Sequence, residues 1–222
     1  MTSVEVAALD APVLLVPVGS FEQHGPHLPL DTDTLIAIQL ANDAGDRLAF
    51  DTVIGPPITI TASGEHHGFA GTLSIGTETT AAVLVEIARS ADWAHGVVFV
   101  NGHGGNSDAI RQARSVFDAE ARRVLVWSPT AEPDDDAHAG RTETSVIAHL
   151  HPNVVDWDRM APGNTTPVTQ LASDLRRGGV QAVSPNGILG DPTGAEGDVG
   201  RRIFERWVGE LVASVTAWKN ET

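Results

Sequence analysis

The sequence predicts an α/β fold with a mostly parallel central sheet. Apolar runs of strand length alternate with stretches in which apolar residues recur at helical spacing, the pattern of helices that cross over between parallel strands. The clearest apolar runs are nearly continuous, which is typical of strands covered on both faces. With 222 residues and 41% hydrophobic content the chain can fill one core, so we expect a single domain over residues 1–222.

Five segments are expected to form strands. Three of them are short and almost wholly apolar, and two carry a weaker pattern of the same kind. The three clear ones are Val13–Val18, Val97–Val100 and Val124–Trp127. The two weaker ones are Thr52–Ile54 and Val180–Val183.

Helices are expected where apolar residues recur at helical period. The last segment shows this most clearly, because Val199, Ile203, Trp207, Leu211 and Val215 share one face while charged residues take the other. The expected helices are Thr34–Leu48, Thr79–Ser90, Ser107–Arg122, Thr142–Leu150 and Asp198–Trp218. Pro162–Pro167 and Gly187–Gly197 are expected to be loops within the domain.

The composition excludes several functions. With 29 acidic against 14 basic residues the formal net charge is -15, so neither nucleic acid nor anionic membrane is an expected partner. No window approaches the roughly 20 apolar residues that span a bilayer, and the amino terminus lacks the pattern of a signal peptide, so we expect a cytoplasmic protein. Because the chain has no cysteine, histidine, carboxylate and hydroxyl side chains must carry any reaction.

Three polar clusters come shortly after predicted strands. Residues 22–33 follow the first strand, residues 101–106 follow Val97–Val100, and residues 138–145 come soon after Trp127. In open parallel sheets, ligands bind outside the carboxyl ends of the strands. We therefore expect the three clusters to form one site.

The first cluster holds Glu22, His24 and Asp33. It could be a solvated loop with an incidental histidine. However, prolines and a glycine stiffen it, which is useful where ligands must be preorganised. Glu22 and His24 would leave an extended chain on the same side, and Asp33 would return toward them.

The other two clusters each allow a second interpretation. The glycine-rich turn at Asn101–Asn106 could cradle a phosphate through backbone amides, although His103 has no role in such a cradle. Arg141 or Thr142 could stand near the start of a helix whose dipole favours Glu143, although the nearby His138 makes a joint site the better interpretation.

Together these side chains predict a metal site. Glu22, His24, Asp33, His103 and Glu143 supply enough nitrogen and oxygen ligands for two divalent ions, with Asp33 as the expected bridge. Two ions about 3.5–4 Å apart suit hydrolysis, because they acidify a bridging water and polarise the bond under attack. Zinc, manganese and iron(II) all fit this ligand set.

The motifs resemble those of the creatininase family of amidohydrolases. They are Glu-Gln-His-Gly-Pro-His-Leu-Pro-Leu-x-Thr-Asp from Glu22, Asn-Gly-His-Gly-Gly-Asn from Asn101 and His-Ala-Gly-x-x-Glu-Thr-Ser from His138, and Gly190-Asp191-Pro192 is similar to a further signature. The resemblance implies a three-layer α/β/α sandwich, a homo-oligomer and a two-metal site that hydrolyses an amide bond. It also implies that Glu22, His24, Asp33, His103 and Glu143 are the metal ligands and that His138 assists the reaction.

The chain departs from the creatinine-hydrolysing members in two places. They carry a glutamate where this chain has Gly105, so Glu143 must stand in as a ligand, and they place aromatic cover where this chain has Asp134–Asp136. Creatinine is therefore not the expected substrate. The chain instead looks most like the branch that cleaves a modified ribosomal precursor peptide near its carboxyl terminus in mycofactocin biosynthesis.

The expected mechanism is attack of a metal-activated hydroxide on the amide carbonyl, with His138 donating a hydrogen bond to the carbonyl oxygen and then a proton to the departing amine. Glu65 and His66 are expected to orient the ligands. Two other functions stay open: hydrolysis of a small formamide or lactam, and anion binding without catalysis at Gly104–Gly105.

Overall fold

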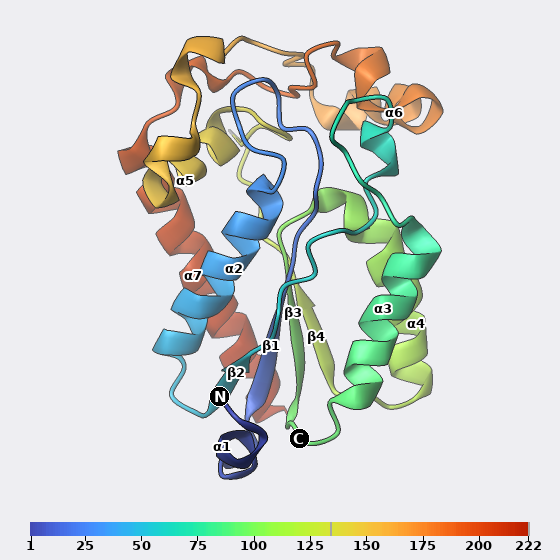
Figure 1. Ribbon diagram of the computed structural model, residues 1–222, viewed down its shortest axis with the longest axis vertical. Coiled ribbons are helices and arrows are strands. Elements are labelled where there is room, and N and C mark those ends of the chain that lie inside the picture. The colour runs from blue at the N-terminus through green and yellow to red at the C-terminus, as the bar shows by residue number, and fades with distance from the viewer. Residues whose placement is uncertain (134, 222) are drawn as a thin grey trace.

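A computed structural model describes residues 1–133 and 135–221 of the chain. Its centre is a four-stranded sheet in the order β2-β1-β3-β4, in which every neighbouring pair is parallel (Figure 1). The strands are β1 Val13–Val18, β2 Thr52–Ile54, β3 Gly96–Asn101 and β4 Val124–Trp127. The predicted α/β class and parallel sheet are confirmed, and four of the five predicted strands are present.

Helices precede, connect and follow these strands. The α-helices are α1 Ser3–Ala7, α2 Thr32–Arg47, α3 Thr77–Ser90, α4 Ser107–Ala119, α5 Arg141–Leu150, α6 Val168–Val183 and α7 Gly197–Asn220. Short 3-10 turns lie at Gly64–His66, Gly104–Asn106, Pro152–Val154, Trp157–Arg159 and Pro192–Gly194. The five predicted helices are all present, with ends that differ by a few residues.

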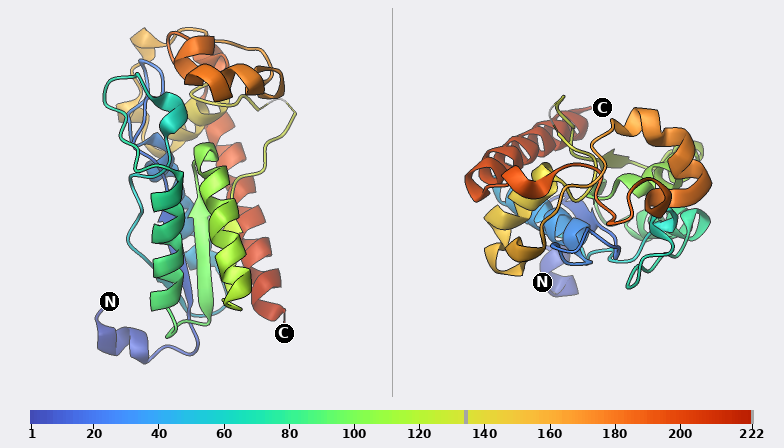
Figure 2. Two further views of the ribbon diagram at one scale, coloured as in Figure 1. Left: turned by 90° about the vertical axis from the view of Figure 1, so that its right-hand side faces the viewer. Right: turned by 90° about the horizontal axis from the view of Figure 1, so that it is seen from above.

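The helices cover both faces of the sheet. Helices α2, α5 and α7 lie on one side, and α3 and α4 lie on the other (Figures 1 and 2). Residues alternate along β1, so that Leu15 packs in the first layer of core while Leu14 and Val16 pack in the second. A strand buried on both faces must be apolar at every position, which explains the continuous apolar run. The expected three-layer sandwich is confirmed.

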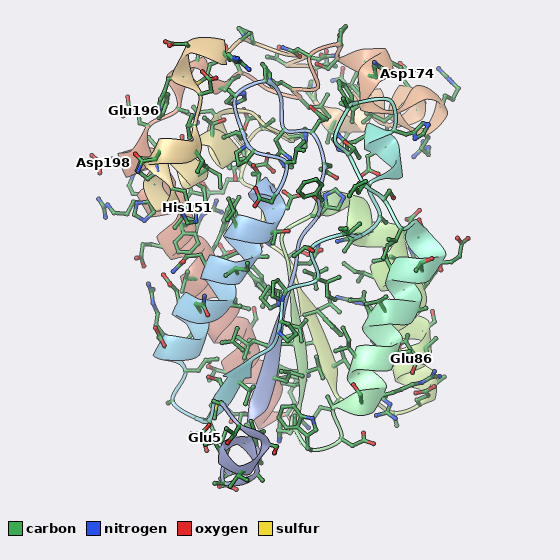
Figure 3. The ribbon with its side chains drawn as sticks, in the orientation of Figure 1. Glu5, Glu86, His151, Asp174, Glu196 and Asp198 are labelled. Carbon is green, nitrogen blue, oxygen red and sulfur yellow. The ribbon has the colours of Figure 1, made fainter. Side chains whose placement is uncertain are left out.

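Apolar and acidic side chains are separated between the interior and the surface. Apolar side chains fill the space between the layers, and acidic ones such as Glu86 and Asp174 lie at the periphery (Figure 3). Within the described residues, no helix has the length and apolar character needed to cross a bilayer.

The predicted strand Val180–Val183 is wrong, because these residues form the end of α6. A short apolar run cannot distinguish a strand from a buried helix segment. Here Val180 packs with Leu171 and Leu189 in a small cluster apart from the two layers of the main core. Gly178-Gly179 masked the helical pattern, since α6 kinks at Gly179, where φ is +68°.

Candidate metal centre

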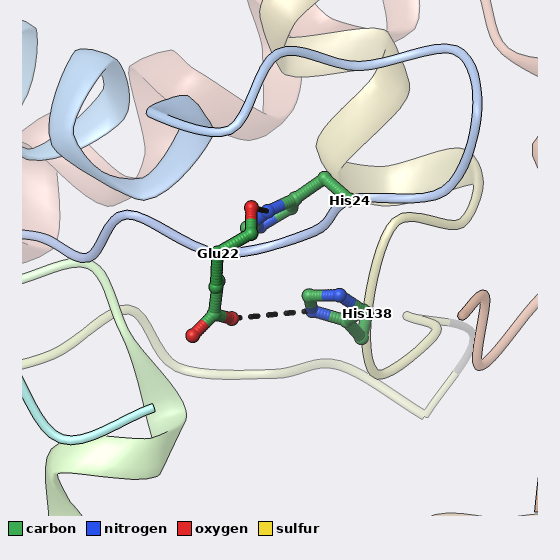
Figure 4. Close-up of side chains that lie close together, drawn as sticks. All are labelled: Glu22, His24 and His138. Atoms are coloured by element: carbon green, nitrogen blue, oxygen red, sulfur yellow. Dashed lines mark hydrogen bonds and ion pairs between the residues drawn. The ribbon is translucent and has the colours of Figure 1, made fainter. Parts of the chain in front are cut away.

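The three polar clusters meet where the strands of the sheet end. The loop after β1 carries Glu22 and His24, the first turn of α2 carries Asp33, and the segment after β3 carries His103. His138 precedes α5, and Glu143 lies in the first turn of that helix. The structure therefore brings together all six side chains that were predicted as metal ligands or as the catalytic group. Figure 4 shows how closely Glu22, His24 and His138 approach one another.

The Glu22 carboxylate is fully buried in the cluster. Its side chain is 0% exposed, and burial raises the pKa of its carboxyl to about 7. Histidine nitrogens lie nearby: Nε2 of His66 and of His103 at 3.1 Å, and Nδ1 of His138 at 3.9 Å. None of these contacts has hydrogen-bond geometry, so neither oxygen of Glu22 accepts a hydrogen bond from the described residues. Because a buried carboxylate without hydrogen bonds is costly unless a positive charge lies beside it, we expect a cation to bind here.

Asp33 lies between two histidines. Its Oδ1 is 3.1 Å from His24 Nε2 and its Oδ2 is 3.0 Å from His103 Nδ1, while the Ser20 hydroxyl donates to Oδ2 at 2.8 Å. Burial alone would raise the pKa of Asp33, but the two imidazoles outweigh burial and hold it well below its usual range. Asp33 is therefore an anion placed between two potential nitrogen ligands.

His24 turns its second ring nitrogen toward these carboxylates. Its Nδ1 lies 3.1 Å from the Glu22 backbone carbonyl, which can only accept, so Nδ1 carries a proton. Metal-ligating histidines commonly donate their other N–H in this way. Its Nε2 then faces Asp33 and lies 3.8 Å from Glu143 Oε2.

His24 and His103 both hold protons strongly beside these carboxylates. Burial lowers both pKa values, but Asp33 and Glu22 outweigh burial, helped by Glu143 at His24 and by Glu65 at His103, and raise both to about 10. A proton therefore lies where the carboxylates and the ring nitrogens converge, and a divalent ion could take its place.

Glu143 was placed correctly in the first turn of a helix, but it does not cap that helix. Its Oε2 accepts from the Ala139 N–H at 2.5 Å and faces His24, and burial raises its pKa to about 7. Asp136 takes the capping role instead, because its carboxylate accepts from the backbone N–H groups of Arg141 and Thr142. The substitution of Asp134–Asp136 for aromatic cover thus supplies a cap at Asp136, while Asp134 lies outside the described residues.

Gln23 is a member of the site that sequence reasoning missed. Its Oε1 accepts from the Gly25 N–H at 2.9 Å, so its two amide hydrogens are free to donate. They go to the Gly187 carbonyl at 2.9 Å and to His66 Nδ1 at 2.8 Å. In the sequence, Gln23 lies between the predicted ligands Glu22 and His24. That position was the one feature that could have indicated its role in the site.

Hydrogen bonding to Gln23 also determines which nitrogen of His138 carries the proton. Nε2 of His138 lies 2.9 Å from the backbone carbonyl of Gln23, so Nε2 carries the hydrogen and Nδ1 presents its lone pair on the side of Glu22. Burial and the neighbouring His24 and His66 hold the pKa of His138 well below its usual range. His138 is therefore a neutral imidazole whose unprotonated Nδ1 faces the cluster.

Of the residues in the segment Glu65-His66-His67, Glu65 and His66 lie at the cluster and His67 does not. His66 is buried, and burial together with His103 and His24 lowers its pKa to about 3. Because its Nδ1 accepts from Gln23, its hydrogen is on Nε2, on the side of Glu22. Glu65 Oε1 lies 3.6 Å from His103 Nε2, whereas His67 is exposed.

The donor set fits divalent ions. Two groups that share no residue, Glu22 with Glu65 and His103, and His24 with Asp33 and Glu143, each place three ligand atoms within 4.8 Å of one another. Glu22, His24 and His138 form a third such group. All are nitrogen and oxygen donors, which suit zinc, manganese and iron(II) alike. The cluster opens into a cavity of about 350 Å³ that α6 partly lines.

Metal binding should stabilise the protein more as pH rises. In the metal-free fold the raised pKa values mean that Glu22 and Glu143 retain protons up to about pH 7 and His24 and His103 up to about pH 10, whereas the unfolded chain releases them nearer 4.5 and 6.5. Stability from these protons is lost as pH rises through the folded values, and a metal ion must displace the same protons. Calorimetry with and without Zn²⁺ or Mn²⁺ should show a larger rise in Tm at about pH 8 than at about pH 6. A rise in Tm that shrinks with pH would contradict this linkage.

Comparison with known proteins supports one family. The model of the creatininase family, described as creatinine amidohydrolase, matches residues 1–215. A mycofactocin precursor peptide peptidase of Mycobacterium ulcerans (strain Agy99) is 49% identical over 215 residues, covering 93% of this chain and 86% of the relative. The protein of the same name from Mycolicibacterium smegmatis is also 49% identical, over 213 residues, covering 94% and 86%.

Solved creatininase structures have the same fold. A creatininase with a tryptophan-to-phenylalanine substitution superposes with a TM-score of 0.81 at 25% identity, covering 100% of this chain and 98% of that one. Two further creatininase structures, both 24% identical and covering 100% of this chain and 97% of their own, superpose with TM-scores of 0.80 and 0.77 and are described as Zn-Zn and Mn forms.

The fold and the matching family model define an amidohydrolase of the three-layer α/β/α class. Within that class, the chain belongs to the creatininase family. The expectations of this family, of its fold and of an enzyme acting on amide bonds are confirmed.

Proposed function

We propose that this chain is a metal-dependent peptidase that cleaves a modified ribosomal precursor peptide near its carboxyl terminus in mycofactocin biosynthesis. The observation that carries the metal-dependent part is the buried Glu22 carboxylate, whose oxygens accept no hydrogen bond from the described residues and which stands among nitrogen and oxygen donors. The names of relatives that are 49% identical to this chain over the aligned residues support the substrate.

Two divalent ions held by Glu22, His24, Asp33, His103 and Glu143 would acidify the attacking water and polarise the scissile carbonyl. The chain's own contribution is proton transfer. Because Nε2 of His138 is bound to the Gln23 carbonyl, Nδ1 must accept a proton before it can give one. His138 thus takes a proton from the attacking water and delivers it to the departing amine, which modifies the expected role as an initial hydrogen-bond donor.

The cavity beside the cluster suits the end of a peptide. Four carboxylates line the cavity, and two divalent ions would neutralise their charge. Arg176 is the one arginine or lysine among the described residues that line the cavity. Its charge is therefore available for the terminal carboxylate of the substrate. Val168, Leu175 and Val180 supply apolar surface for the last side chains of the peptide. All four of these residues come from α6.

Replacing Arg176 with glutamine should raise KM for the peptide by roughly tenfold with little change in kcat, because a charge-assisted hydrogen bond contributes about 1.5 kcal/mol or more. Arg177→Gln is the matched control, since Arg177 pairs with Asp174 and does not line the cavity. Amidating the peptide's terminus should weaken binding to the wild-type enzyme by a similar factor and leave the Arg176 variant unaffected. Equal losses in both variants would rule out this role.

Mass analysis after incubation with the modified precursor peptide tests the proposed function. Release of a small carboxyl-terminal fragment, abolished by chelation and restored by metal, is the expected result. An intact peptide beside a hydrolysed small formamide or lactam would favour the alternative substrate class. A protein that binds phosphate at Gly104–Gly105 but holds no metal would reject the metal-dependent proposal. The homo-oligomer and the single domain over residues 1–222 stay predictions.

A further inference from the structure

We propose that Glu65 is a ligand of one of the two metal ions, in addition to Glu143 at the other, and that its carboxylate occupies the space beside Gly105. A Cβ atom built on Gly105 would lie 1.8 Å from Glu65 Oε1 and 2.4 Å from His103 Nε2. The backbone of Gly105 is outside the left-handed region, so its conformation does not require glycine. A side chain at position 105 would meet both the carboxylate of Glu65, which reaches the same space from a different segment, and the imidazole of His103.

The surroundings of Glu65 are those of a ligand. Its Oε1 lies 3.6 Å from His103 Nε2, and with Glu22 these residues bring three donor atoms within 4.8 Å of one another. Glu22 is fully buried, and its oxygens accept no hydrogen bond from any residue that the structure describes. Two carboxylates face the same ring nitrogen of His103, and a divalent ion could bind between them in the place of the proton on that nitrogen.

The fold holds Glu65 in this place from two sides. Gly179 of α6 packs against the turn Gly64–His66, because a Cβ at Gly179 would lie 2.5 Å from the Glu65 carbonyl oxygen. On the other side, the Ala62 N–H donates a hydrogen bond to Asn106 Oδ1 at 3.2 Å, and the Ala62 carbonyl lies 3.0 Å from His103 Nε2, a contact that a metal ion on Nε2 would replace. The segment that carries Glu65 is thus tied both to α6 and to the segment after β3.

Supplying the carboxylate from Glu65 has a consequence for the substrate. No atom lies within 4 Å of a Cβ built on Gly104, so this side of the cavity is open, and Gly105 adds no side chain to it. A substrate bulkier than a small lactam can then approach the metal ions along Gly104–Gly105. This inference rests on the proposed function, because it assumes that the cluster binds two ions.

Metal titration of single and double variants tests the role of Glu65. Glu65→Ala should weaken the binding of one Zn²⁺ or Mn²⁺ ion by at least the roughly 10- to 100-fold that supporting residues of metal sites cost, and should leave the other ion bound. Elemental analysis after dialysis should then find one ion per chain in place of two. Exposed Glu78, in the first turn of α3, provides the control variant Glu78→Ala, which should keep both ions.

The double variant Glu65→Ala/Gly105→Glu should regain affinity for the second ion, because removing the Glu65 carboxylate takes away the nearer of the two obstacles at position 105 and leaves only the His103 imidazole to shift. Thermal unfolding in a chelator establishes that each variant is folded. The inference is overturned if Glu65→Ala binds both ions as the wild type does. A wild-type protein that binds no ion would instead reject the proposed function itself.

Discussion

Replacing His138 with alanine is expected to lower kcat for peptide cleavage by roughly a hundred- to a thousandfold while both metal ions stay bound. His138 is held as a neutral imidazole by the Gln23 carbonyl on Nε2 and by burial beside His24 and His66. Its Nδ1 lies on the cluster side, 3.9 Å from Glu22 Oε1, where it can take up and return a proton. No other described imidazole in the cluster is both neutral and unprotonated on that side.

Single-turnover kinetics with elemental analysis of the same samples measure this effect. His67→Ala is the control, because His67 is exposed and should leave both kcat and metal content unchanged. If His138→Ala loses an ion, His138 is a ligand, as its grouping with Glu22 and His24 would also allow. If it keeps full turnover, the proton path through Nδ1 is wrong.

Glu22→Gln should abolish measurable turnover. The same substitution should stabilise the metal-free protein above about pH 7 and destabilise the metal-bound protein. Glutamine keeps the shape but removes the charge, so metal affinity should fall by more than the roughly 10- to 100-fold typical of supporting residues. Burial raises the pKa of Glu22 to about 7 from an ordinary 4.5. The folded state therefore loses stability as pH rises through about 7, and removing the carboxyl removes that loss.

Calorimetry on the metal-free and metal-loaded forms shows both halves of this prediction. Above about pH 7 the metal-free Glu22→Gln variant should have a higher Tm than the wild type, and the order should reverse when metal is present. A variant that is less stable than the wild type in both forms would mean that Glu22 serves the fold rather than an ion.

Much of the fold could be predicted because the sheet is buried on both faces. Strands β1 and β4 have the predicted bounds, since each is an apolar run that no amphipathic helix would show. Helix α6 could not be predicted in the same way. It packs only Leu171 and Val180 closely, and its pair of glycines breaks the helical pattern, so its position above the site depends on contacts that local sequence does not contain.

The candidate site was predictable where residues follow the ends of parallel strands, because topology alone brings such residues together. That principle placed Glu22, His103 and His138 in one cluster. The roles of Gln23 and Glu65 depend instead on how loops fold over that edge. The tautomers that Gln23 sets and the space that Glu65 takes from position 105 are visible only in three dimensions.

Anomalous diffraction from crystals of the metal-loaded protein, recorded at the absorption edge of the bound metal, tests the central claim most directly. The account predicts two peaks about 3.5–4 Å apart, one beside Glu22, Glu65 and His103 and the other beside His24, Asp33 and Glu143. An empty cluster in an active enzyme, or a metal bound elsewhere on the chain, would contradict it.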